Sequence, residues 1–201
     1  MRSSAASDVY KRQPKLLGEK EYSIMLQAMQ TIHRRSKGLL NFVENYRKLS
    51  RLSAPILAPV NIGDLLSDMK KLFPNKNIQY IYKVENPETT LMLDRSQIEQ
   101  VLINLLKNAG EACVEQIYPE VIISTHCDLE KHLFFLSVCD NGSGILPEVL
   151  DKIFVPFFTT KPTGSGIGLS LCKQIMNLHG GSISASSEIG KGSCFCLLYT
   201  S

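Results

Sequence analysis

Apolar residues recur at alternating steps of four and three between about Glu19 and Leu52. A heptad repeat of this kind predicts a long helix that packs against other helices. Two prolines, Pro55 and Pro59, follow the repeat and predict a short stiff linker, because proline cannot continue a helix. We interpret the repeat as one arm of a helical hairpin or bundle that mediates dimerisation. Its stripe consists of Met25, Met29, Ile32, Ser36, Leu39, Val43, Tyr46 and Ser50.

The rest of the chain alternates between short strand-like runs and helical runs, in an order that predicts an α+β fold. We expect a two-layer α/β sandwich, with helices on one face of a mixed sheet, preceded by one long helix. Asp94 is the predicted N-cap of the longest later helix, with Gln97 completing a capping-box-like pattern. Predicted strands cover residues 60–62, 78–84, 90–93, 120–127, 132–139, 183–187 and 193–198. Predicted helices cover residues 63–72, 97–116 and 166–179, and residues 140–163 are predicted to form a lid.

Composition is that of an ordinary soluble globular protein, with 44% apolar and 20% charged residues. The net charge of +3 is small and no segment concentrates lysine and arginine, so we expect no nucleic-acid partner. The six cysteines form no Cys-x-x-Cys pair, and most lie in apolar runs. We therefore expect reduced thiols, as in a cytoplasmic protein, in preference to disulfides or zinc ligands. No apolar run approaches the roughly 18 residues that span a bilayer, and no signal peptide is visible.

Four short segments carry the chemistry that a nucleotide site needs. Carboxamides can ligate a metal ion, a carboxylate can accept a hydrogen bond from a base, and glycine backbone at a helix start can hold phosphates. No Gly-x-x-x-x-Gly-Lys-Ser/Thr sequence is present, which excludes a P-loop NTPase. The segments are Asn104–Asn108, Asp140–Gly144, Phe154–Phe158 and Gly164–Gly168.

Together and in this order, the segments resemble the N, G1, F and G2 boxes of the sensor histidine kinase ATP-binding domain, in the GHKL superfamily. The resemblance covers roughly residues 60–199. The stretch from Thr31 to Arg47 is similar to the second helix of the dimerisation hairpin in NtrY-like sensor kinases. The resemblance implies that ATP and Mg²⁺ are the cofactors and that the intact protein is a homodimer.

In the first box, the resemblance implies that Asn108 ligates Mg²⁺ and that Asn104 and Lys107 lie toward the triphosphate. Glu111, one turn after Asn108, is interpreted as a helix-surface or structural residue. GHKL relatives that hydrolyse ATP have a glutamate in the place of Asn104, where it activates water. An amide cannot act as a general base, so the sequence favours a kinase over a dedicated ATPase.

For the adenine of ATP, the resemblance implies that Asp140 accepts a hydrogen bond from the amino group. Gly142 and Gly144 would let the backbone approach the base, and the Ser193 hydroxyl would help to hold adenine. The phosphates of ATP would bind at the start of the predicted helix at 166–179, and Lys161 would reach the terminal phosphates from the lid. Three phenylalanines, Phe154, Phe157 and Phe158, are expected to anchor the lid without direct chemistry. By the same resemblance, the residues expected to bind the phosphates are Gly164, Ser165, Gly166, Ile167, Gly168 and Leu169.

The phosphoacceptor histidine of such kinases lies in a His-Glu/Asp-x-x-Asn/Thr-Pro motif, and none of the four histidines has that context. His33 is followed by Arg34-Arg35, without an acidic neighbour. We therefore expect no catalytic acceptor in this chain and no autophosphorylation. The resemblance implies transfer of the ATP γ-phosphoryl group to a histidine on the missing acceptor helix, and then to a response regulator receiver domain.

The expected organisation has four parts: a non-native tail at 1–13, part of the dimerisation hairpin at 14–54, a linker at 55–59 and the ATP-binding catalytic domain at 60–201. We expect a cytoplasmic location, either free or as the cytoplasmic portion of a membrane-anchored sensor. Two alternatives stay open: a GHKL serine kinase of the anti-sigma type, and a non-catalytic ATP-binding module. The heptad helix argues against the first, and the four intact boxes argue against the second.

Overall fold

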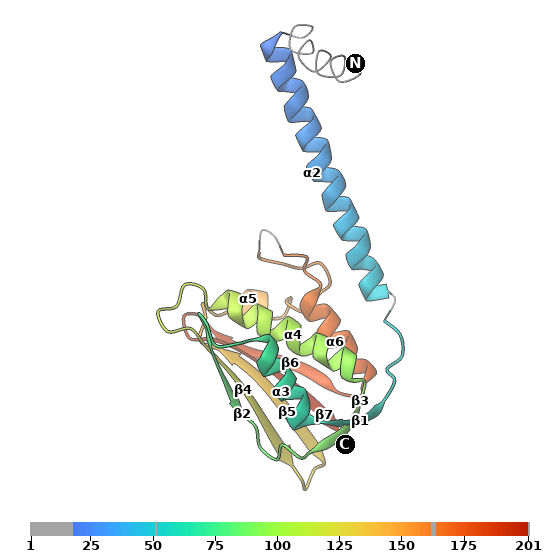
Figure 1. Ribbon diagram of the computed structural model, residues 1–201, viewed down its shortest axis with the longest axis vertical. Coiled ribbons are helices and arrows are strands. Elements are labelled where there is room, and N and C mark those ends of the chain that lie inside the picture. The colour runs from blue at the N-terminus through green and yellow to red at the C-terminus, as the bar shows by residue number, and fades with distance from the viewer. Residues whose placement is uncertain (1–17, 51, 162–163, 201) are drawn as a thin grey trace, which may run out of the picture. The chain divides into compact units, whose positions relative to one another are not determined.

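The computed structural model describes residues 18–50, 52–161 and 164–200, and it divides between Lys48 and Leu49 into two compact units. Helix α2 (Glu19–Ser50) provides the described part of the first unit (Figure 1). Every described side chain of α2 before Leu49 is exposed, including the apolar residues of the heptad stripe. The predicted tail at 1–13 lies outside the described residues. None of the described helices has both the length and the hydrophobicity needed to cross a membrane.

The second unit is built on a five-stranded sheet in the order β2-β4-β5-β7-β6. β2 runs parallel to β4, and the other neighbours are antiparallel. The strands are β2 (Gln79–Lys83), β4 (Glu120–Asp128), β5 (Leu133–Asp140), β6 (Ser182–Glu188) and β7 (Gly192–Thr200). Helices α3 (Ile62–Leu72), α4 (Arg95–Ala112) and α6 (Gly168–Leu178) form the second layer (Figure 1). The predicted two-layer α/β sandwich, preceded by one long helix, is confirmed.

The core lies between these layers and follows the helical and strand periods of the sequence. In α4, residues three and four apart face the sheet, so Val101, Leu105 and Ala109 are buried. In β5, alternate residues do so, and Leu136 and Val138 are buried. The opposite face of α4 is therefore free to serve a site.

Two strands are paired differently from what their adjacency in the sequence suggests. β3 (Thr90–Leu93) follows β2 in the chain, yet it pairs with β1 (Ala58–Asn61) in a separate two-stranded sheet. The turn between β2 and β3 is held against the start of α3, where the Gly63 N–H donates to the Pro87 carbonyl at 2.9 Å. This contact directs the chain away from a hairpin.

Both ends of α4 differ in detail from the predicted helix at 97–116. Asp94 is the N-cap and accepts from the Gln97 N–H at 3.2 Å, as expected. The Gln97 side chain instead donates to the Ser53 carbonyl, so the reciprocal half of the capping box does not form. The helix ends at Ala112, because the carbonyl of Ala112 accepts from the Ser143 N–H at 3.3 Å.

The expectation that all cysteines are reduced is wrong for one pair, because Cys139 and Cys194 form a disulfide in the structure. These residues are register partners in β5 and β7, which brings them together although they lie 55 residues apart in the sequence. Cysteine spacing alone carries no information about such cross-strand register. Four cysteines are free: Cys113, Cys127, Cys172 and Cys196.

Candidate functional site

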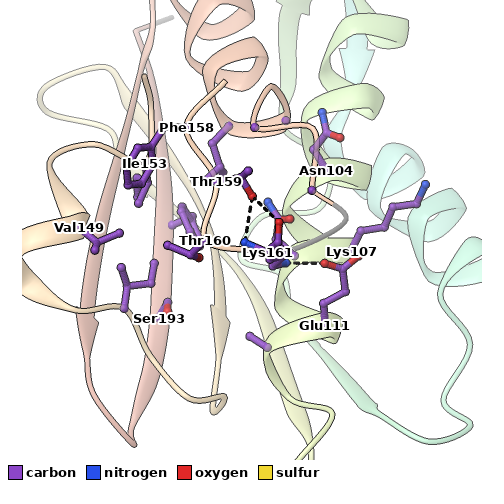
Figure 2. Close-up of a pocket in the computed structure, with 18 of the residues that line it drawn as sticks. Asn104, Lys107, Glu111, Val149, Ile153, Phe158, Thr159, Thr160, Lys161 and Ser193 are labelled. Atoms are coloured by element: carbon purple, nitrogen blue, oxygen red, sulfur yellow. Dashed lines mark hydrogen bonds and ion pairs between the residues drawn. The ribbon is translucent and has the colours of Figure 1, made fainter. Parts of the chain in front are cut away.

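A cavity of about 570 Å³ opens between α4, the adjoining ends of β5 and β7, and the loops that precede α6 (Figure 2). All predicted site residues except Gly142 and Ile167 line it. The predicted residues that line it are Asn104, Lys107, Asn108, Asp140, Gly144, Lys161, Gly164, Ser165, Gly166, Gly168, Leu169 and Ser193. Four segments far apart in the sequence therefore meet at one cavity.

Gly142 and Ile167 do not line the cavity, and each has a supporting place in the fold. A Cβ on Gly142 would lie 2.5 Å from the Ala112 carbonyl oxygen, so only glycine lets this loop pass the end of α4. Ile167 is buried and precedes α6, where its carbonyl accepts from the Leu171 N–H at 2.9 Å. Their contribution to the site is through backbone position.

Asp140 lies at the end of β5 and is only 8% exposed. Its Oδ1 accepts from the backbone N–H groups of Gly142 at 2.9 Å and Ser193 at 3.3 Å. Burial raises the pKa of the Asp140 carboxyl, while these two N–H groups and the charge of Lys161 oppose the rise. Because Oδ1 is held by two backbone donors, the orientation of Oδ2 is fixed as well. Such a carboxylate is suited to accept a hydrogen bond from a donor on a ligand.

One face of α4 supplies the polar wall of the cavity. Asn104, Lys107, Asn108 and Glu111 follow steps of three and four, and all line it. Figure 2 labels three of them, Asn104, Lys107 and Glu111. Amide oxygens are ligands that Mg²⁺ accepts in combination with phosphate and water. Among the described residues, no three His, Cys, Asp or Glu side chains form a metal-binding group. The chemistry of the wall therefore fits a cation that arrives with a phosphate ligand.

Next to this wall lies the first turn of α6, whose N-cap residue makes no side-chain hydrogen bond. The free N–H groups of a helix start favour an anion, as does the positive end of the helix dipole. Gly168 opens the helix close to α4, because a Cβ there would lie 3.7 Å from Asn104 Oδ1. The cavity thus combines a buried carboxylate with a helix start, close to the amide of Asn104, whose N–H groups favour an anion.

The segment before α6 turns back on itself through two residues in the left-handed region. Phe157 has φ 65° and Gly166 has φ 69°, and the Phe157 N–H donates to the Gly166 carbonyl at 2.8 Å. A Cβ on Gly166 would lie 2.4 Å from the Phe157 carbonyl carbon. Glycine at 166 is therefore needed for this close backbone approach, which sets the base of the predicted lid.

The three phenylalanines expected to be lid anchors lie in different surroundings. Phe154 is half-buried against the core and lies beneath Lys173, whose Nζ is 5.7 Å from the ring centre. Phe158 lines the cavity, and Phe157 is 39% exposed. A purely anchoring role thus describes Phe154 best.

Sequence reasoning missed part of the lining. Glu111, interpreted as a helix-surface residue, lines the cavity and forms an ion pair with Lys161 (Figure 2). Glu111 lies two helical turns after Asn104, so the period of the helix could have placed it in the same wall. No pattern in the local sequence identifies the apolar residues of the lining. The other lining residues missed are Ala112, Ser143, Ile145, Val149, Ile153, Phe158, Thr159, Thr160 and Phe195.

Residues 93–200 match the family model described as histidine kinase-, DNA gyrase B-, and HSP90-like ATPase. Sensor protein FixL of Bradyrhizobium diazoefficiens is 36% identical over 120 residues, which cover 60% of this chain and 24% of FixL. A putative NtrY-like sensor histidine kinase of Rickettsia prowazekii is 30% identical over 167 residues, covering 82% of this chain and 27% of that protein. The chain spans about a quarter of the length of these two curated relatives.

Solved structures agree with this match. The catalytic domain of histidine kinase ThkA has a TM-score of 0.64 and 34% identity, covering 72% of this chain and 95% of that domain. ThkA in complex with response regulator protein TrrA has a TM-score of 0.67 and 28% identity, covering 96% of this chain and 55% of that one.

Proposed function

The chain belongs to the family of histidine kinase-, DNA gyrase B-, and HSP90-like ATPases, and we propose that it is the ATP-binding catalytic part of a bacterial sensor histidine kinase. One observation carries the proposal: a single cavity collects a buried carboxylate, a row of amides and an uncapped helix start. These groups match an adenine base, a magnesium ion and a run of phosphates. The relatives named above include a putative sensor histidine kinase and the histidine kinase ThkA, which favours this function over a serine kinase of the anti-sigma type or a non-catalytic module.

In this mechanism the protein mainly positions its substrate. Asp140 accepts a hydrogen bond from the adenine amino group, and the first turn of α6 holds phosphate oxygens. Asn108 would hold Mg²⁺ through its amide oxygen, and the bound ion would neutralise phosphate charge. Asn104 provides no general base, unlike the glutamate of relatives that hydrolyse ATP, which favours transfer of the γ-phosphoryl group to an acceptor over hydrolysis. Alignment and charge neutralisation then account for catalysis, as in other phosphoryl transfers.

The partners follow from the same proposal. The acceptor is a histidine on the hairpin helix of the intact kinase, and the exposed apolar stripe of α2 pairs with helices of a homodimer. The phosphoryl group then passes to the receiver domain of a response regulator. ThkA has been solved with such a regulator, which supports this class of partner. We place the reaction in the cytoplasm, where ATP is available.

The acceptor prediction is tested by supplying the missing helix. Incubated with γ-labelled ATP and Mg²⁺, the chain itself is expected to acquire no acid-labile label, because His33 lacks the acidic neighbour. A separate hairpin from an NtrY-like kinase is expected to become labelled on its histidine. Acid-labile label on His33, mapped by mass spectrometry, would contradict the first expectation. A nucleotide-binding chain that labels no acceptor would favour the non-catalytic module.

The metal role of Asn108 is tested by Asn108→Ala. Loss of the amide oxygen is expected to remove the magnesium dependence of ATP binding, since Mg²⁺ then lacks its protein ligand. Calorimetric titration with ATP, with and without Mg²⁺, measures this dependence directly. Asn177→Ala, an exposed change on α6 outside the cavity, serves as the control and is expected to behave as wild type. An unchanged magnesium dependence in Asn108→Ala would remove this residue from the metal site.

A further inference from the structure

The ion pair between Lys161 and Glu111, two residues that line the cavity, joins the segment before α6 to α4 (Figure 2). Glu111 lies on the same helical face as Asn104 and Asn108, and Lys161 follows the turn made by Thr159. The Lys161 N–H donates to Thr159 Oγ1 at 3.1 Å, which fixes the backbone from which the lysine extends. The side chains of Lys161 and Glu111 are 44% and 59% exposed, so water and ligands can reach both.

The two carboxylates that line the cavity differ in what holds them. Asp140 is buried and accepts hydrogen bonds from two backbone N–H groups, so the position of its carboxylate is fixed. Glu111 is exposed, and its carboxylate accepts a hydrogen bond from the Lys161 ammonium group. Exposed ion pairs are weak, so this pair can exchange partners at small cost.

We propose that Glu111 is a positioning residue that holds Lys161 in the nucleotide-free cavity and yields it to the phosphates of an incoming nucleotide. The inference rests on the proposed function. A polyphosphate is a stronger partner for Lys161 than one carboxylate, and its negative charge repels Glu111. Glu111 therefore orders the lid while the cavity is empty and competes with β- and γ-phosphates for the lysine. This competition weakens nucleotide binding and favours release of the spent nucleotide.

Glu111→Gln is expected to make the lid less ordered without nucleotide and to raise the affinity for Mg·ATP. Without nucleotide, backbone amides at 157–161 are expected to exchange hydrogen about two- to fivefold faster than in wild type, because the ion pair is lost. With saturating Mg·ATP, exchange is expected to equal that of wild type. Affinity for Mg·ATP is expected to rise about two- to fivefold, and affinity for AMP, which lacks the competing phosphates, is expected to stay unchanged.

Hydrogen exchange of the full chain, measured by mass spectrometry, tests the effect on the lid. Calorimetric titration with Mg·ATP and with AMP tests the effect on affinity. Glu115→Gln is the matched control, because Glu115 is exposed, lies just beyond α4, and does not line the cavity. It is expected to match wild type in every measurement. Equal lid exchange in wild type and Glu111→Gln without nucleotide would overturn the proposal, as would weaker Mg·ATP binding by the variant. If wild type binds neither nucleotide, the proposed function fails together with the inference, whereas normal wild-type binding with an unchanged Glu111→Gln refutes the inference alone.

Discussion

Asp140→Asn is expected to lose ATP affinity by about ten- to 150-fold while the domain stays folded. Asn keeps an oxygen in the place of Oδ1, where the N–H groups of Gly142 and Ser193 donate. The amide nitrogen then takes the place of Oδ2 and turns a donor toward the adenine amino group, which is also a donor. Hydrogen bonds to charged groups contribute about 1.5–3 kcal/mol, and each 1.4 kcal/mol changes Kd tenfold.

The same change is expected to leave stability at neutral pH equal or higher. Burial raises the pKa of Asp140, so the folded state keeps its proton to a higher pH than the unfolded chain does. Between those two pKa values the folded state binds more protons, and its stability falls as pH rises. Asn removes that penalty. Calorimetric titration and thermal unfolding measure affinity and stability separately.

Asp151→Asn is the matched control for Asp140→Asn, because Asp151 is exposed and lies outside the cavity. It removes the same charge and is expected to leave the affinity unchanged. An Asp140→Asn protein that is folded and binds ATP as wild type would contradict the assignment of Asp140 to the base. A variant that gains affinity for GTP would instead support it, since guanine has a carbonyl where adenine has an amino group.

Gly166→Ala is expected to reduce phosphoryl transfer to a supplied acceptor helix by about a hundredfold. Alanine in the left-handed region costs about 1–2 kcal/mol, and its Cβ would lie 2.4 Å from the Phe157 carbonyl carbon. The backbone must move apart, which breaks the hydrogen bond from the Phe157 N–H to the Gly166 carbonyl. Displacement of a positioning group by about 1 Å can cost about 10²-fold in rate. Labelled-phosphate transfer at saturating Mg·ATP measures this loss.

Gly180→Ala is the control that has the backbone strain of Gly166→Ala without its steric clash with Phe157. Gly180 has φ 72°, close to that of Gly166, yet a Cβ there meets no atom within 4 Å. It is expected to lose about the same 1–2 kcal/mol of stability through backbone strain, with a transfer rate near that of wild type. Equal rates for the two alanine variants would mean that the contact between Phe157 and Gly166 does not position the phosphates.

Local periodicity made the helices and the polar face of α4 predictable. The polar face of α4 follows from steps of three and four, and Asp94 was identifiable as an N-cap from the three residues that follow it. Each of these features depends on residues within a turn or two of one another. The boxes that line the cavity were identified by their resemblance to the sensor histidine kinase ATP-binding domain, which required no knowledge of the sheet.

Features that depend on register or on distant contacts were not predictable. The pairing of β3 with β1, and the alignment of Cys139 with Cys194, depend on which strands meet in the folded sheet. The pair of Glu111 and Lys161 joins residues 50 positions apart across an irregular segment. No period relates such residues, so Glu111 had the appearance of a surface side chain.

Thermal unfolding with Mg·ATP and with Mg·GTP tests the central claim most directly. Ligand at about 100 times its Kd adds about 2.7 kcal/mol to the free energy of unfolding. For a domain of this size, we expect a rise in Tm on the order of 5–10 °C with ATP and no rise with GTP. A folded sample whose Tm does not change with ATP, or rises equally with both nucleotides, would contradict an adenine-specific nucleotide site in this cavity.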